Sequence, residues 1–186
     1  MSPLRWAVAI VLALNIAPAA RAAPPPAPTQ AAQKEAQRLA HLPPVVPYGS
    51  RIDHSGRAEK GRVSYYGRWF DNRKMADGKR FNPNANIAAS KTLPLGTTAK
   101  VTNLRNGKTA TVQVEDRGPW IRGRVVDVTP KVANELDFRK QGVVPVVVAP
   151  ITVPQPDGAV KLGAGAANVS PQEVEKATQE TEAAAR

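Results

Sequence analysis

Val112-Gln113-Val114-Glu115-Asp116-Arg117-Gly118-Pro119-Trp120 is the stretch that decides how the rest of the chain is interpreted. Val112 and Val114 alternate with polar residues, which predicts a strand with one buried face. The Asp-Arg-Gly-Pro sequence then breaks the strand and predicts a turn. Asp116 is therefore expected at the end of a strand, where rigid scaffolds often present functional side chains. The alternative is a turn aspartate that hydrogen-bonds its own backbone.

Strand-like runs recur on both sides of this stretch. They are Arg62–Tyr66, Ile87–Ala89, Thr98–Leu104, Lys108–Val114, Arg124–Val128 and Val143–Ala149. Asn106-Gly107 separates the third run from the fourth and predicts a hairpin with a type I′ turn. Thr129-Pro130 predicts a helix start, and an apolar face built from Val132, Ala133 and Leu136 would continue to about Gly142. Six short strands with one short helix predict a mainly β, small closed barrel over residues 61–151.

The beginning of the chain has the pattern of an export signal over residues 1–22. Arg5 precedes the apolar run Trp6–Ile16, and Ala20-Arg21-Ala22 fits a small-x-small cleavage site. A membrane anchor is the alternative, but the run is too short to span a bilayer comfortably. We expect cleavage, export to the periplasm and no lasting membrane anchor. Because the chain has no Cys, we also expect no lipid attachment.

Two segments of biased composition flank the expected barrel. Residues 23–60 form a Pro/Ala-rich linker, with one short helix expected over residues 30–40. Residues 152–186 are expected to be disordered or marginally helical. Ser170-Pro171-Gln172-Glu173 predicts a helix start there. The helix that follows is mostly Ala, Glu, Thr and Gln, which gives it too little apolar face to dock firmly.

Composition excludes several kinds of site. Without Cys, the chain has no disulfides, thiol nucleophiles or cysteine metal sites. Its two histidines, His41 and His54, both precede the expected barrel, which argues against a zinc site or a His-based triad. We therefore expect no metal and no cofactor.

The expected barrel is strongly basic, with 16 Lys and Arg against 7 Asp and Glu in residues 61–151. Such a surface attracts polyanions. Nucleic acid is the generic partner, and aromatic side chains such as Tyr66 and Trp69 could stack on bases. The export signal argues against nucleic acid and favours the acidic cell-wall polymer of bacteria. Aromatic faces also suit sugar rings, although part of this aromatic set is expected in the core.

Five ordered motifs carry a family resemblance across residues 61–151. They are Val63-Ser64-Tyr65-Tyr66-Gly67, Ala76-Asp77-Gly78 with Phe81, Ala88–Gly96, Val101-Thr102-Asn103-Leu104 with Asn106-Gly107, and Asp116-Arg117-Gly118-Pro119 followed by Gly123–Asp127. Together they resemble the rare lipoprotein A (RlpA) family. The resemblance implies a double-psi β-barrel and a periplasmic endolytic transglycosylase. Its substrate would be peptidoglycan glycan strands, preferentially those without stem peptides, and the protein would act as a monomer.

The resemblance also implies roles for individual residues. Asp116 matches the family's catalytic aspartate. One carboxyl could both protonate the glycosidic oxygen and deprotonate the sugar's own C6 hydroxyl, so no water would be consumed. Apolar neighbours such as Trp120 would raise the pKa of Asp116, and a close Arg117 would lower it. The substrate-binding residues expected around Asp116 are Tyr66, Trp69, Asp77, Lys79, Ser90, Arg117 and Trp120.

Two positions depart from the family pattern. Lys79 stands where the family has Glu, and Ser90 where it has His. Lys79 would lower the pKa of a nearby Asp116 and keep it ionised, and Asp77 could substitute for the missing carboxylate. Three functions remain open: a transglycosylase, an expansin-like barrel that binds glycan without cutting, and an adaptor that docks envelope proteins through the acidic tail or the Pro-rich arm.

Overall fold

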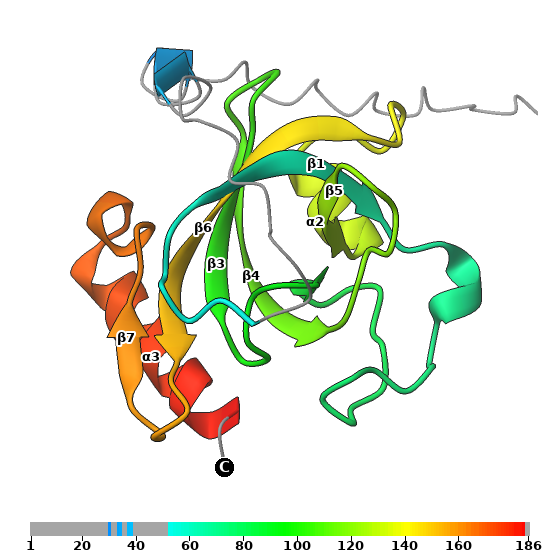
Figure 1. The fold of residues 1–186 in the computed structure, drawn as a ribbon. Coiled ribbons are helices and arrows are strands. Elements are labelled where there is room, and N and C mark those ends of the chain that lie inside the picture. Colours follow the sequence, from blue (N-terminus) through cyan, green and yellow to red (C-terminus); the bar gives the residue numbers. More distant parts are fainter. Residues whose placement is uncertain (1–29, 31–32, 35–36, 39–51, 185–186) are drawn as a thin grey trace, which may run out of the picture.

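The computed structural model describes residues 30, 33–34, 37–38 and 52–184 (Figure 1). The predicted signal peptide lies outside the described residues, as does most of the predicted linker. The described residues between 30 and 38 are helical, which agrees with the short helix predicted there.

All six predicted strands are present. They are β1 (Glu59–Tyr65), β2 (Ile87–Ser90), β3 (Thr98–Asn103), β4 (Thr109–Asp116), β5 (Arg124–Val128) and β6 (Val144–Pro154). β1 begins two residues before the predicted barrel boundary, and β6 continues three residues past it. The alternation of apolar and polar residues explains why β4 forms. Val112 and Val114 are buried in the core cluster, while Gln113 between them is partly exposed.

The strands close into a mixed barrel in the order β1-β5-β2-β4-β3-β6, and β6 pairs back with β1. The β1–β5 and β2–β4 pairs are parallel, and the other pairs are antiparallel. This is the predicted double-psi β-barrel. The largest fully buried side chains include Val63, Val101 and Val126 from the strands and Phe138 from the segment after the helix. Closure leaves none of these six strands with a long free edge.

The β3–β4 hairpin is confirmed, but its predicted type I′ turn is wrong. Gly107 has φ +74, whereas Asn106 is not among the described residues with positive φ. A type I′ turn needs positive φ at both central residues. The hairpin is longer than two residues: Gly107 N donates to Asn103 O at 2.8 Å, and Asn103 N donates to Lys108 O at 2.9 Å. Gly107 is thus the residue that reverses the chain.

The predicted helix after β5 is confirmed at its start and is shorter than expected. Helix α2 spans Pro130–Glu135, and the Thr129 hydroxyl caps it by accepting from Val132 N at 3.4 Å. It ends before Gly142 because Asp137 takes a left-handed conformation with φ 55. Val132, Ala133 and Leu136 are fully buried against the barrel, as the predicted apolar face requires.

The prediction of a disordered or weakly docked tail is wrong. After β6 the chain forms β7 (Val160–Leu162), the short helix η2 (Ala166–Asn168) and the 14-residue helix α3 (Pro171–Ala184). β7 extends the sheet beside β6, and α3 lies with it on one flank of the barrel (Figure 1). The capping prediction holds, since Ser170 Oγ accepts from Glu173 N at 3.2 Å.

Helix α3 docks through small side chains and hydroxyl groups, which explains why its composition hid the interface. Thr181 is fully buried, and its hydroxyl lies 2.7 Å from the Thr152 hydroxyl and donates to Gly96 O at 3.1 Å. Ala177 is buried as well. A side chain on Gly96 would place its Cβ 3.0 Å from Ala184 Cβ, so glycine allows the close approach. Hydrogen bonds between buried polar groups thus hold α3 on the barrel in place of a large apolar face.

The long connection between β1 and β2 carries a second, smaller core. It begins with the helix η1 (Arg68–Phe70), which lies on the opposite side of the barrel from α3 (Figure 1). Tyr66 is buried here, with its ring centroid 4.6 Å from that of Phe81 and 4.9 Å from that of Phe70. Met75, Ile87 and Ala89 complete this cluster. The connection is thereby held over the end of β4.

Candidate active site

Asp116 is the last residue of β4, and two donors from the β1–β2 connection fix its carboxylate. The Tyr66 hydroxyl donates to Asp116 Oδ2 at 2.8 Å, and Ala76 N donates to Oδ1 at 3.0 Å. Burial raises the pKa of the Tyr66 hydroxyl, and the Asp116 carboxylate raises it further, so Tyr66 remains a donor. Tyr66 therefore meets Asp116 as predicted, but as a buried support and not as an open stacking face.

The turn after Asp116 has the predicted breaker geometry. Gly118 has φ +124, and the Gly118–Pro119 peptide bond is cis. Trp120 then returns beside Gly118, with its indole ring 3.9 Å or less from where a Gly118 Cβ would stand. A side chain at position 118 would be strained whatever the space.

A second carboxylate, Asp127, faces the same side of the sheet and was not assigned a role from the sequence. In the β2–β4 pair Ala89 lies opposite Asp116, and in the β2–β5 pair the same Ala89 lies opposite Asp127. Residues opposite one another on neighbouring strands share a face. The signal in the sequence was an acidic residue inside the apolar run Val125-Val126-Asp127-Val128.

Asp127 is held by a polar chain that begins on β1. The Ser64 hydroxyl donates to Asp127 Oδ1, and Arg124 donates from its guanidinium to the Ser64 hydroxyl at 3.0 Å. Burial raises the pKa of Asp127, while Ser64 and Arg124 oppose that shift. Asp127 as a residue is half-buried.

Arg117 does not fold back onto Asp116 in the way that adjacency suggested. Its guanidinium donates to the main-chain oxygens of Ser90 at 3.2 Å and Leu93 at 2.6 Å. Burial lowers the pKa of Arg117, and the nearby Asp116 partly offsets this. Arg117 thus ties the end of β4 to the turn after β2.

Ser90 occupies that turn and is 1% exposed. Its hydroxyl accepts from Thr92 N at 3.2 Å and from Leu93 N at 3.1 Å. These bonds organise the backbone whose carbonyls hold Arg117. The burial argues against the predicted contact between Ser90 and substrate.

Lys79 is paired differently from the prediction. Its ammonium lies 2.9 Å from Glu115 Oε1 and 3.2 Å from Asp77 Oδ2. The hydrogen bond to Glu115 raises the pKa of Lys79, and Asp77 adds to this. Lys79, the cation predicted beside Asp116, is therefore paired with Glu115 and Asp77 instead. Asp77 pairs with Lys79, and its Oδ1 also accepts from Lys79 N at 2.9 Å. Glu115 is the partner that sequence reasoning missed, although it adjoins Asp116.

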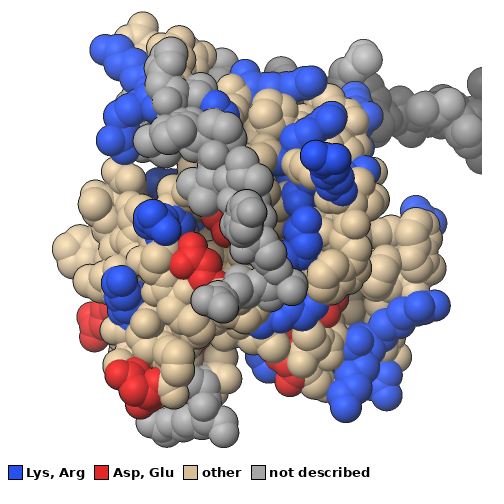
Figure 2. Space-filling view, viewed as in Figure 1, with Lys and Arg blue, Asp and Glu red and all other residues tan. Residues whose placement is uncertain are grey.

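Two tryptophans predicted at the site are largely open to solvent: Trp69 is 69% exposed and Trp120 is 75% exposed. Trp69 packs over Gly67, where an added Cβ would stand 2.4 Å from the indole ring. Exposed basic side chains share the same connection; they are Arg68, Arg73, Lys74, Lys79 and Arg80. On the face of the molecule drawn in Figure 2, basic side chains outnumber acidic ones.

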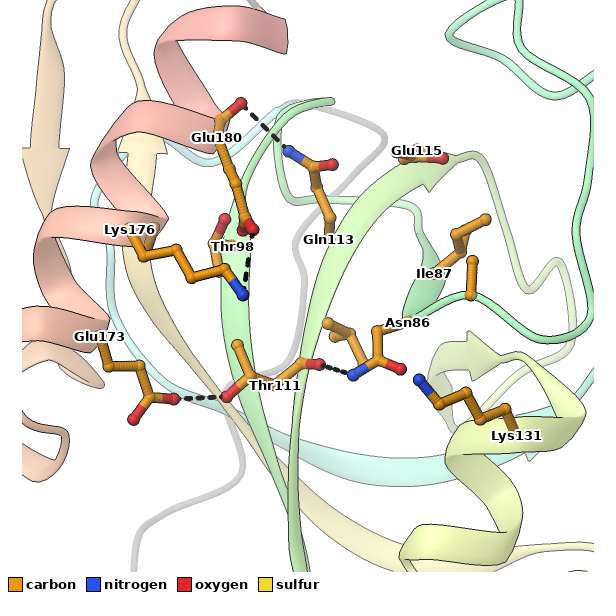
Figure 3. A pocket seen from close by; sticks show the side chains of 13 residues that line it. Asn86, Ile87, Thr98, Thr111, Gln113, Glu115, Lys131, Glu173, Lys176 and Glu180 are labelled. Atoms are coloured by element: carbon orange, nitrogen blue, oxygen red, sulfur yellow. Dashed lines mark hydrogen bonds and ion pairs between the residues drawn. The ribbon is translucent and has the colours of Figure 1, made fainter.

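A polar groove separates α3 from β4 and the start of β2 (Figure 3). Its larger part has a volume of about 580 Å³. A smaller part of about 370 Å³ shares Gln113, Glu115 and Glu180 with it and reaches Asp77 and Lys79. Gln113 bridges the groove by donating to the main-chain oxygen of Glu180 at 3.2 Å. The docked tail therefore builds a wall beside the loop that supports Asp116.

Two negative findings hold for the part of the chain that the structure describes. Within it, no group of three or more His, Cys, Asp or Glu side chains is arranged to hold a metal ion. Within the same residues, no helix has the length and apolar character needed to cross a bilayer.

A family model described as "Lytic transglycolase" matches residues 59–148. The chain is 47% identical over 87 residues to a "Probable endolytic peptidoglycan transglycosylase RlpA" of Synechocystis sp., covering 47% of this chain and 27% of that protein. It is 40% identical over 121 residues to the protein of the same name in Nostoc sp., covering 64% of this chain and 31% of that protein.

Among solved structures, a Clavibacter michiganensis expansin aligns with a TM-score of 0.39 and 17% identity, covering 50% of each chain. This likeness is too slight to bear on function. The chain spans less than a third of the length of the two curated relatives.

Proposed function

From the match of residues 59–148 to the lytic transglycolase family model, we propose that the protein is an endolytic lytic transglycosylase of peptidoglycan. The reaction breaks a glycosidic bond within a glycan strand. The C6 hydroxyl of the muramic sugar attacks its own C1, which leaves a 1,6-anhydromuramic end. No water enters the product, which separates this reaction from two-carboxylate hydrolysis.

The observation that carries this proposal is the geometry of Asp116. A rigid strand ends at this residue, and two donors hold both oxygens of its carboxylate. Such a group is oriented before substrate arrives, which is what proton transfer requires. Asp116 is also the position that matches the family's catalytic aspartate.

The surroundings support a glycan strand as the substrate. Trp69 and Trp120 offer exposed aromatic faces on two segments that flank Asp116, and such faces suit the apolar edges of sugar rings. The exposed basic side chains on the same connection as Trp69 suit the lactyl and peptide carboxylates of peptidoglycan. Strands without stem peptides would be preferred, as in the family. Arg117 would act behind the site by fixing the turn at Ser90.

The proposed setting follows from the same function. The protein would be exported to the periplasm, released from its signal peptide without a lipid anchor, and active as a monomer. It would use no metal or other cofactor and would not bind nucleic acid.

Asp116→Asn tests the proposal directly. Asparagine keeps the size and accepts from Tyr66 or Ala76, but it cannot exchange a proton. Formation of anhydromuramic ends on purified sacculi should fall by about two to four orders of magnitude. Muropeptide analysis by chromatography and mass spectrometry measures those ends. The melting temperature and sacculus binding should stay close to those of the wild type.

Wild-type protein that forms no anhydro ends would contradict the proposal, as would an Asp116→Asn variant with full activity. A second candidate function, an expansin-like barrel that binds glycan without cutting, draws on one specific observation. Both family departures are engaged in structural contacts, Lys79 with Glu115 and Ser90 within a buried turn. Tight sacculus binding without anhydro products would favour it. The adaptor function would require neither binding nor cleavage of sacculi.

A further inference from the structure

The transglycosylase reaction moves two protons, and the positions that the family fills with Glu and His hold Lys79 and Ser90 in this chain. Neither can take over a proton transfer, because Lys79 is bound to Glu115 and Asp77 and the Ser90 hydroxyl is buried in a turn. Asp77 is likewise paired with Lys79. A second proton-transfer group must therefore come from elsewhere, unless Asp116 serves both steps.

The sheet register places one other carboxylate beside Asp116. Asp116, Ala89 and Asp127 form a row across β4, β2 and β5, and the row continues to Ser64 on β1. Neighbouring strands lie about 4.8 Å apart, so the two aspartate backbones are roughly 10 Å apart. That separation leaves room for a glycosidic bond between the two side chains.

Both carboxyl groups point toward the same side of the barrel. Tyr66 bonds Asp116 directly, and the charges of both Asp116 and Asp127 raise the pKa of its hydroxyl. Ala89, between the two aspartates, packs in the same cluster as Tyr66. This shared side matters chemically, since the leaving oxygen and the incoming C6 oxygen occupy the same face of the sugar at C1.

We propose that Asp127 is the acid that protonates the departing glycosidic oxygen, while Asp116 accepts the proton of the C6 hydroxyl; this inference rests on the transglycosylase function proposed above. The bond between C1 and the glycosidic oxygen breaks as that oxygen takes the proton of Asp127. The C6 oxygen then bonds to C1 and gives its proton to Asp116. The enzyme ends with Asp127 ionised and Asp116 protonated, and exchange with solvent restores both.

The environment of Asp127 suits an acid. Burial raises its pKa first of all, and the negative charge of Asp116 raises it further. Ser64, Arg124 and Lys91 act in the opposite direction by favouring the ionised form. The balance keeps a larger fraction of Asp127 protonated near neutral pH than for an ordinary aspartate, and Ser64 is the group through which this balance can be changed without touching the carboxyl.

The test compares two substrates. Sacculi have a sugar leaving group that needs a proton, whereas a chitooligosaccharide with a 4-nitrophenyl leaving group releases a phenolate that needs none. Asp127→Asn should lower cleavage of sacculi by about two to four orders of magnitude and lower release of nitrophenol by less than about tenfold. Asp116→Asn should impair both reactions. Melting temperatures of the variants establish that each is folded.

Ser64→Ala supplies an independent readout. Wild-type activity should decline toward alkaline pH as Asp127 ionises, and Ser64→Ala should move that decline to higher pH because it removes a bond to the ionised carboxylate. This readout also serves if Asp127→Asn does not fold.

The outcomes separate this inference from the function on which it rests. Active wild-type protein with an equally active Asp127→Asn variant would overturn the role of Asp127 and leave the transglycosylase function intact. Equal losses on both substrates, or an alkaline limb that Ser64→Ala does not move, would also overturn it by assigning Asp127 a structural role. Wild-type protein without activity on sacculi would overturn the function itself.

Discussion

Thr181→Val tests whether hydroxyl groups hold α3 on the barrel. Valine has nearly the shape of threonine, so the change removes the hydroxyl and leaves packing almost untouched. The Thr181 hydroxyl meets Thr152 Oγ1 at 2.7 Å, Gly96 O at 3.1 Å and Thr98 Oγ1 at 3.5 Å, all within a buried interface. The variant therefore removes these buried bonds, while Thr152 keeps its bond to Ala177 O at 3.2 Å.

The size of the effect follows from these contacts. Leaving a buried polar group unsatisfied costs about 1–3 kcal/mol. We expect the free energy of unfolding to fall by that amount if α3 unfolds together with the barrel. For a folded unit of this size, each kcal/mol lowers the melting temperature by about 3–4 °C. The melting temperature should then drop by roughly 3–12 °C on the same scaling.

Thermal melting measures the global effect, and amide hydrogen exchange of α3 measures the local one. Thr178→Val is the matched control, because the Thr178 hydroxyl donates to Val174 O within the helix at 2.9 Å and not to the barrel. The control should change stability by less than about 0.5 kcal/mol, because Thr178 is only partly buried and its hydroxyl makes no bond to the barrel. Unchanged melting and unchanged exchange protection in Thr181→Val would refute the idea that hydroxyls dock the helix. A loss confined to exchange would show that α3 opens separately.

Two further predictions concern the barrel itself. Gly107→Val should destabilise the protein by about 1–2 kcal/mol, because a β-branched residue resists the φ of +74 at this turn, whereas Gly107→Asn should cost less. Equal melting temperatures for the two variants would contradict this. Glu59 is 3% exposed, and burial raises its pKa above the value of 4.5 that it has when exposed. The stability that this raised pKa contributes is therefore complete below pH 4.5 and is lost as pH rises through the pKa of Glu59 in the folded protein. Glu59→Gln should therefore lessen the decline of the melting temperature between pH 4 and 7. Parallel curves of melting temperature against pH for variant and wild type would count against this prediction.

The barrel was predictable because its signals are local. Alternating valines predicted β4, and Thr129-Pro130 predicted the start of α2, since strand periodicity and helix capping depend on neighbours in sequence. The sequence predicted that the chain reverses near Gly107, but it did not predict the correct type of turn. The conformation of Asn106 depends on where the paired strands end, which neighbouring residues do not determine.

The site was only partly predictable because its partners come from distant segments. Sequence indicated Asp116, but the register that sets Asp127 beside it depends on how β2 pairs with two strands at once. The sequence placed Lys79 near the site. Its pairing with Glu115 and not with Asp116 follows from the path of the connection between β1 and β2. The docking of α3 was missed because threonine and alanine resemble a solvent-exposed helix unless a complementary surface is known.

Closure of the barrel by β1 and β6 also constrains the order of folding. Glu59 pairs with Val148, so the first and last strands of the barrel must meet across most of the domain. Until β6 has joined, β1 and β3 each keep an unpaired edge that can bind a neighbouring chain. Such long-range pairing favours slow folding. The chain thus stays vulnerable to aggregation until β6 has paired with β1, and chaperone protection would be most valuable during that interval.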